Sequence, residues 1–311
     1  MGTPEFAVTI LDQIIQAGHD VAAVVTTPDR PAGRGQHLKC SDVKQYALAH
    51  ELPILQPEKL KDPDFVAELQ RLNAEAFVVV AFRMLPNCVY TIPPKGTFNV
   101  HASLLPQYRG AAPIQWAIIN GESETGVTTF LLDEHTDTGD IIGQKKVSIT
   151  RDDNAGTLHD KLMLAGAELA VETLHNMEQN TLTPARQTTA GTLKSAPKIF
   201  KEDMHIQWDD TAENIYNKIR GLSPYPGAFT LLADKNSSRT TQLKIFRCAI
   251  SDSKSAEKPG VLRIQDHKNL YISTKTDDIR VEIVQIEGKK QMKTADFLAG
   301  FHPEYYTEIL K

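Results

Sequence analysis

Short apolar runs alternate with amphipathic segments along residues 1–178, and this alternation limits the possible folds more than any other feature. The runs at residues 21–25 and 77–81 are continuously apolar, as expected of strands that are buried on both faces. Apolar residues at helical spacing predict helices at residues 4–16, 41–50 and 62–72. Strands that alternate with helices indicate an α/β fold with a doubly wound, mainly parallel sheet and helices on both faces.

The rest of the chain follows another pattern. A helix that begins near residues 152–154 is predicted to end at about residue 178, and a polar, Thr-rich segment at residues 179–198 is interpreted as a linker. After a short helix, five β-rich runs lie at residues 228–232, 242–250, 260–264, 270–274 and 279–286. This spacing is typical of a small barrel or a sandwich. We therefore expect an α/β domain at residues 1–178 and a β domain at residues 199–311.

Composition narrows the class of protein. No apolar run reaches the roughly 18 residues that a membrane span needs, and the N-terminus carries no secretory signal pattern. The three cysteines (Cys40, Cys88 and Cys248) are scattered and odd in number, which fits a reducing compartment and gives no disulfide framework. The sequence contains no Walker loop, no GxGxxG after a strand and no HExxH, so neither a nucleotide cofactor nor a metal is predicted. We expect a cytoplasmic monomer.

Three polar side chains lie where predicted strands end. Asn99 and His101 close the strand predicted at residues 97–100, and Asp137 lies in the polar loop after the strand at residues 126–132. Strand alternation points Asn99 and His101 to the same side, and open α/β sheets bind ligands at the carboxyl ends of their strands. These groups can move protons or polarise a carbonyl. A lone histidine is more often structural, and Asp137 could instead form an Asx turn with Thr138-Gly139.

Four motifs, in this order, closely resemble those of the folate-dependent formyltransferases. They are Asn99-x-His101, Ser103-Leu104-Leu105-Pro106, Tyr108-Arg109-Gly110-Ala111-Ala112-Pro113-Ile114 and Asp137-Thr138-Gly139-Asp140. The segment MGTPEFAV and the segment at residues 28–35 narrow the resemblance to the members that act on initiator methionyl-tRNA. His135-Thr136 departs from the family, which usually has a small residue and then an apolar one there.

The resemblance implies transfer of a formyl group from 10-formyltetrahydrofolate to the amino group of methionine on initiator methionyl-tRNA. In that reaction Asn99 would stabilise the oxyanion, His101 would polarise it or move the amine proton, and Asp137 would fix the histidine or relay the proton. The loop Ser103, Leu104, Leu105 and Pro106 would line the folate site. No metal is implied.

The resemblance also implies a tRNA surface. Arg30, Arg34, Lys39 and Lys44 surround the loop at residues 29–40, which contacts the acceptor arm in this family. Lys289 and Lys290 resemble a second basic patch in a C-terminal domain that the family builds as an OB-like barrel. The alternatives are another acceptor, such as a glycinamide nucleotide, an amino sugar or water, and a non-catalytic RNA-binding protein.

The last expectation concerns the first strand of the α/β sheet. Members of the family usually begin with a short apolar strand ahead of the segment found here at residues 1–6. Since the first strand of a doubly wound sheet commonly lies near its centre, we expect a gap or an exposed strand edge in its place. We also expect the natural protein to start several residues upstream.

Overall fold

Two compact units that exchange chain segments make up the protein. The computed structural model describes residues 1–32, 37–188, 191–235, 239–301 and 306–310. The N-terminal unit comprises Met1–Pro113, Glu124–Ser148 and Asp160–Ala196. The C-terminal unit comprises Ile114–Ser123, Ile149–His159 and Pro197–Lys311. The chain enters the C-terminal unit for the last time at Pro197, whereas the sequence predicted that this domain begins at residue 199. Two short earlier segments also belong to the C-terminal unit, and Ile119 in the first of them packs on its core.

The sheet of the N-terminal unit is mixed rather than mainly parallel. The largest sheet of this unit contains β5 (Phe77–Val79), β6 (Thr97–His101), β8 (Glu124–Leu131) and β9 (Ile141–Ser148), in the order β5-β6-β8-β9. β5 and β6 are parallel, as are β1 (Val24–Val25) and β4 (Ile54–Leu55). β8 is antiparallel to both β6 and β9, which contradicts the prediction for this half of the sheet. Residues 132–140 are too few for the crossover of a dozen or more residues that would make β8 and β9 parallel.

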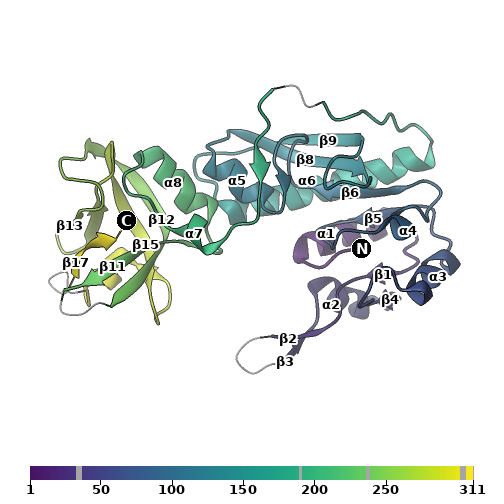
Figure 1. Cartoon of the computed structure of the whole chain (residues 1–311), viewed down its shortest axis with the longest axis horizontal. Helices are drawn as coiled ribbons and strands as arrows, with labels where there is room; N and C mark the ends of the chain where they lie inside the picture. The colour runs from purple at the N-terminus through teal and green to yellow at the C-terminus, as the bar shows by residue number, and fades with distance from the viewer. Residues whose placement is uncertain (33–36, 189–190, 236–238, 302–305, 311) are drawn as a thin grey trace. The chain divides into compact units, whose positions relative to one another are not determined.

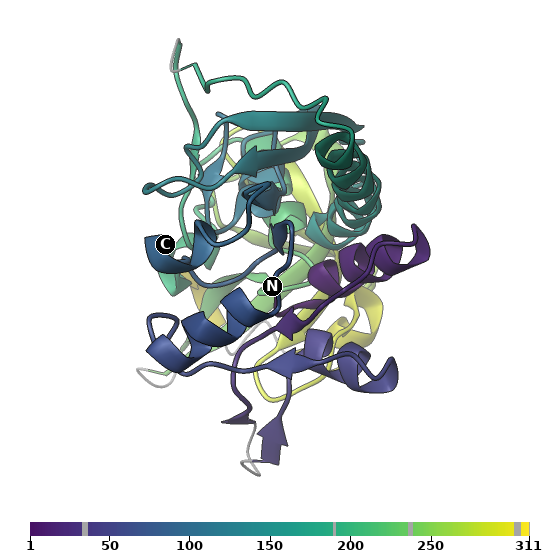
Figure 2. The same ribbon diagram turned by 90° about the vertical axis from the view of Figure 1, so that its right-hand side faces the viewer.

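Helices cover both faces of these strands. They are α1 (Glu5–Gln16), α2 (Asp42–Ala49), α3 (Pro63–Arg71), α4 (Asn87–Tyr90) and α6 (Ala155–Glu178). Ser41 caps α2 by accepting the Lys44 N–H at 3.1 Å, as its type and position favour. α3 and α4 bury Phe65, Leu69 and Val89 against β1 and β5. α6 runs along β6, β8 and β9 (Figure 1 and Figure 2), and its Thr173 hydroxyl lies 2.9 Å from that of Thr129 in β8.

The C-terminal unit is built on one antiparallel sheet. Its strands are β11 (Ala228–Asp234), β12 (Thr240–Lys254), β13 (Leu262–Gln265), β14 (Asn269–Ile272), β15 (Asp277–Ile286), β16 (Met292–Lys293) and β17 (Tyr306–Leu310). Helix α8 (Ala212–Gly221) packs Ile215 and Ile219 into the core of this sheet, together with α9 (Thr294–Leu298), while α7 (Lys201–Met204) precedes it. The strand order is β13-β14-β15-β12-β11-β17, and within the described residues the two end strands do not pair to close a barrel.

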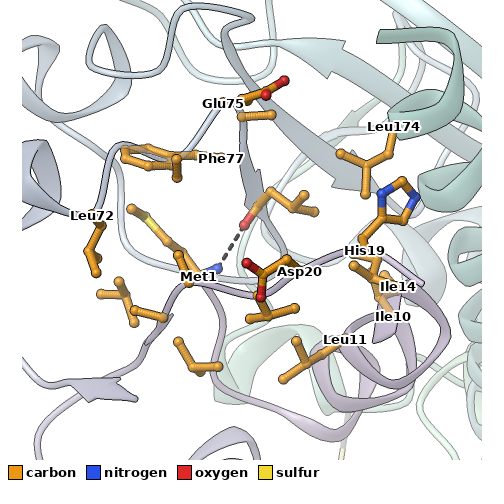
Figure 3. Close-up of a pocket in the computed structure, with 18 of the residues that line it drawn as sticks. Met1, Ile10, Leu11, Ile14, His19, Asp20, Leu72, Glu75, Phe77 and Leu174 are labelled. Atoms are coloured by element: carbon orange, nitrogen blue, oxygen red, sulfur yellow. Dashed lines mark hydrogen bonds between the residues drawn. The ribbon is translucent and has the colours of Figure 1, made fainter. Parts of the chain in front are cut away.

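A cavity of about 480 Å³ lies between β1 and β5, at the place where we expected a gap in the sheet (Figure 3). Met1 and Gly2 bridge one end of it. Gly2 donates its N–H to Val25 O at 3.0 Å, Val80 donates to Met1 O at 2.9 Å, and the Met1 amine donates to Val78 O at 2.7 Å. The remaining lining includes residues 18–25 and 72–78, so the cavity extends toward the amino ends of both strands. The expected gap in the sheet is therefore present.

We expect an apolar extension ahead of Met1 to fill this cavity and stabilise the fold. Adding Ile-Val-Val should raise the free energy of unfolding in urea by several kcal/mol, because burying each such side chain contributes about 1.5–3 kcal/mol. A Ser-Asp-Ser extension of the same length is the control and should give no comparable gain. Equal stability of the two extended chains would contradict this use of the cavity.

Candidate active site

The contacts of His101 leave one of its ring nitrogens able to accept a proton. It ends β6 with 6% of its surface exposed, and its ring edge meets Phe130 of β8 at a centroid distance of 6.5 Å. Nε2 lies 3.0 Å from the Tyr108 carbonyl oxygen. Because a carbonyl only accepts, Nε2 must carry a proton, and the neutral ring then has its lone pair on Nδ1. Nδ1 is therefore the nitrogen that can take up a proton.

Asp137 faces this nitrogen. Its Oδ2 lies 3.8 Å from His101 Nδ1 and accepts the Gly110 N–H at 3.0 Å. The side chain is 12% exposed, and the backbone is left-handed, with φ 56°. A carboxylate at this distance can stabilise the positive charge of an imidazole that has taken up a proton, and the Gly110 N–H fixes the position of that carboxylate. The pair can accept a proton and stabilise the resulting charge.

Asp137 reaches His101 by a route that differs from the prediction. β8 is antiparallel to β6, and Leu131 pairs with Phe98, so the carboxyl end of β8 lies away from His101. The loop instead folds back over Phe130. Gly139 makes this possible, since a Cβ there would lie 1.7 Å from the Leu131 carbonyl oxygen. The predicted proximity is found, but a tight loop causes it rather than a shared strand edge.

Asn99 lies on the same face of β6 as His101, as strand alternation predicted. It pairs with Val79 of β5 and Phe130 of β8, and it is partly exposed. The amide and the imidazole are therefore next to each other on one face of the sheet, while Thr129 contacts α6 on the opposite face.

The Ser103-Leu104-Leu105-Pro106 loop is fixed by side chains of β8 and β9. Thr128 Oγ1 donates to Ser103 O at 2.7 Å and accepts the Leu105 N–H at 3.1 Å, and Gln144 Nε2 donates to Leu105 O at 2.9 Å. The Ser103 hydroxyl donates to the Gln107 carbonyl oxygen at 2.6 Å. The Leu105 side chain is buried, whereas Leu104 and Pro106 are partly exposed. A ligand here would therefore meet mainly apolar side chains and backbone.

The segment interpreted as a linker contributes to this site. Ala185 and Ile141 exchange two backbone hydrogen bonds of 2.8 Å, and β10 (Ser195–Ala196) pairs with β7 (Arg109–Gly110). Between these contacts, the buried Gln187 bonds the backbone of the Asp137 loop and the Arg109 guanidinium. A single polar residue in a Thr-rich stretch carries no periodic signal, so Gln187 could not be found from local sequence pattern.

His135 and Thr136, which depart from the family pattern, are both exposed. Asp133, also exposed, organises the turn by accepting the His135 N–H at 2.9 Å and the Thr138 hydroxyl at 2.8 Å. The two residues that differ from the family pattern therefore lie on the outer surface of the loop. Asp133 has a structural role, because its carboxylate holds the turn together.

The basic loop forms, in part, a hairpin. β2 (Arg30–Ala32) pairs with β3 (His37–Lys39), placing the exposed Arg30 and Lys39 directly opposite each other. Arg34 lies outside the described residues. Lys44 is partly buried, with Nζ 2.6 Å from Asp29, and hydrogen bonds from Lys44 and Gln56 lower the pKa of that carboxyl group. Lys289 and Lys290 are exposed after β15.

The described part of the chain carries neither a cluster of metal-binding side chains nor a membrane-spanning helix. No group of three or more His, Cys, Asp or Glu side chains could hold a metal ion there. No helix among these residues is long and apolar enough to span a membrane.

Solved structures with a similar fold include formyltransferases. A sugar 3N-formyltransferase, WlaRD, covers 93% of this chain and 97% of its own, with a TM-score of 0.63 and 22% identity. HypX from Aquifex aeolicus covers 81% of this chain and 43% of its own, with a TM-score of 0.58 and 19% identity. At these identities the likeness concerns the fold.

Sequence comparison is more specific. Residues 1–174 match the model of the formyl transferase family, and residues 198–302 match that of its C-terminal domain. A methionyl-tRNA formyltransferase from Azobacteroides pseudotrichonymphae is 52% identical over 96% of this chain and 94% of its own length. One from Bacteroides fragilis is 46% identical over 97% of this chain and 94% of its own. With both family models matched and the His101–Asp137 pair in place, this chain belongs to the formyl transferase family.

Proposed function

We propose that this protein transfers the formyl group of 10-formyltetrahydrofolate to the amino group of methionine on initiator methionyl-tRNA. The product, N-formylmethionyl-tRNA, would serve translation initiation in the cytoplasm. The relatives named methionyl-tRNA formyltransferase support this acceptor, at 44–52% identity over nearly the whole chain. The observation that carries the chemistry is the 3.8 Å approach of Asp137 Oδ2 to the unprotonated nitrogen of His101.

The reaction forms a bond between the amine nitrogen and the formyl carbon and breaks the bond from that carbon to the folate nitrogen. Negative charge develops on the formyl oxygen, and Asn99 can stabilise it with its amide N–H. The attacking amine must lose a proton, which His101 can accept at Nδ1. Asp137 then stabilises the imidazolium, and the proton can pass to the departing folate nitrogen.

The residues present suit a flat heterocycle as substrate. Ser103, Leu104, Leu105 and Pro106 follow β6, and residues 82–86 follow the adjacent parallel strand β5, so both loops start from the same edge of the sheet. Met84 in the second loop is 68% exposed. Exposed apolar side chains beside a fixed backbone suit a flat ring that needs both apolar walls and hydrogen bonds.

The tRNA surface would include Arg30, Arg34, Lys39 and Lys44. Like charges directly opposite on paired strands repel each other, so a phosphate bound between Arg30 and Lys39 would relieve this repulsion. Lys44 would contribute less, because Asp29 already neutralises it. We further propose that residues 1–178 form the catalytic domain, residues 179–198 the linker and residues 199–311 an OB-like barrel that binds tRNA, and that the protein is a monomer.

Loss of either member of the catalytic pair should abolish most of the turnover. We expect His101→Ala and Asp137→Ala to lower kcat for formyl transfer about a hundred- to ten-thousand-fold, the usual contribution of a positioned proton-transfer group. Discontinuous assays of formyl transfer from formyltetrahydrofolate to methionyl-tRNA measure kcat. His135→Ala removes an exposed histidine from the same loop and should keep wild-type activity. Wild-type turnover in a folded His101→Ala protein would refute the mechanism.

The hairpin charges should control tRNA affinity. The double variant Arg30→Gln/Lys39→Gln should bind methionyl-tRNA more weakly and lower the slope of log K against log salt by about one unit per lost phosphate contact. Its KM for the folate should stay unchanged. Lys44→Gln, which removes a charge already paired, should alter the salt slope less. If the double variant binds tRNA as the parent does, the hairpin lies outside the interface.

A further inference from the structure

We propose that Gln187 is a positioning residue that sets the place of the Asp137 carboxylate, a role that rests on the proposed formyl transfer. Asp137 has a left-handed backbone, with φ 56°, which is uncommon outside glycine although Asp adopts it more often than most residues. The placement of its carboxylate near His101 therefore depends on whatever fixes the loop backbone.

Gln187 bonds that backbone on both sides of Thr138. Its Nε2 donates to Asp137 O at 3.0 Å and to Gly139 O at 2.8 Å. Gln187 is 9% exposed; its bond to Gly139 O is buried and its bond to Asp137 O is partly buried, so losing the donor would leave a buried carbonyl group without a hydrogen bond. The two bonds clamp the loop at the residue that carries the carboxylate.

The other end of the Gln187 amide is also fixed. Its Oε1 accepts Arg109 Nε at 3.1 Å and also Arg109 Nη2. Arg109 precedes Gly110, whose N–H bonds the Asp137 carboxylate at 3.0 Å. The contacts thus close a ring from Arg109 through Gln187 and Asp137 back to Gly110.

An amide is the side chain that this ring requires. One end must accept from a guanidinium while the other donates two hydrogen bonds to carbonyl oxygens, and a glutamine supplies both. A glutamate could still pair with Arg109, but its second oxygen would face two carbonyl oxygens without a proton to donate. Gln187→Glu therefore breaks the clamp while changing little else in size or shape.

The first test is kinetic. Gln187→Glu and Gln187→Met should each lower kcat about 10- to 100-fold, with KM for both substrates within about threefold of the parent. Adding either substitution to Asp137→Ala should cause less than about a threefold further loss, because a residue that acts through Asp137 has nothing left to position. Full additivity with Asp137→Ala would overturn the proposal.

Gln107 supplies a matched control. It also joins the body of the N-terminal unit to the same segment, accepting the Lys194 N–H at 2.8 Å and donating to Thr192 O at 3.3 Å, so its side-chain bonds go to residues 192 and 194 rather than to the Asp137 loop. Gln107→Met should leave kcat within about threefold of the parent. A loss equal to that of Gln187→Met would mean that both glutamines only hold the segment, and would overturn a specific role for Gln187.

A second readout does not need turnover. The Gly110 amide bonds the Asp137 carboxylate, so its hydrogen exchange reports where that carboxylate lies. Exchange at Gly110 should speed up at least about tenfold in folded Gln187→Glu protein and stay near the parent rate in Gln107→Met. Unchanged exchange in both Gln187 variants would overturn the proposal. If the parent protein transfers no formyl group, the proposed function fails, while Gly110 exchange still decides whether Gln187 positions Asp137.

Discussion

The hydrogen bond from the Gly110 N–H to the Asp137 carboxylate is the contact on which the site depends. It joins a loop that follows β6 to a loop that follows β8, and it holds a charged oxygen 3.8 Å from His101 Nδ1. Without it the carboxylate would be free to turn toward water and away from the His101 ring. The Gly139 turn and the segment at residues 185–196 both serve this placement.

The direction of β8 explains why the loop must be tight. Since β8 is antiparallel to β6, its carboxyl end leaves the sheet beside Phe98, and the chain has to come back across Phe130 to reach His101. The same strand supplies Thr128, which fixes the Ser103–Pro106 loop. One antiparallel strand therefore organises both the proposed catalytic pair and the proposed folate wall.

The gap between β1 and β5 affects a different part of the sheet. At the carboxyl ends of β1 and β5, Met1 and Gly2 form hydrogen bonds with backbone groups of Val25, Val78 and Val80. A cavity of about 480 Å³ separates the amino ends of these two strands. The cavity is lined by residues 18–25 and 72–78 and by α1 and α6 side chains, none of them a proposed site residue. The site is held by β5, β6 and β8, whose pairing does not depend on that slot.

Local pattern in the sequence determined the helices, most strands and the family motifs. Apolar periodicity and the caps at Ser41 and Asp62 are set by neighbouring residues, so α1, α2 and α3 could be predicted within about two residues of their ends. Strand alternation likewise put Asn99 and His101 on one face. Only tertiary structure decided the antiparallel course of β8 and β9, the return of Asp137 to His101 and the joining of Gln187 to both loops. The last two rest on hydrogen bonds between residues 27 to 78 positions apart, which no local pattern of residue types records.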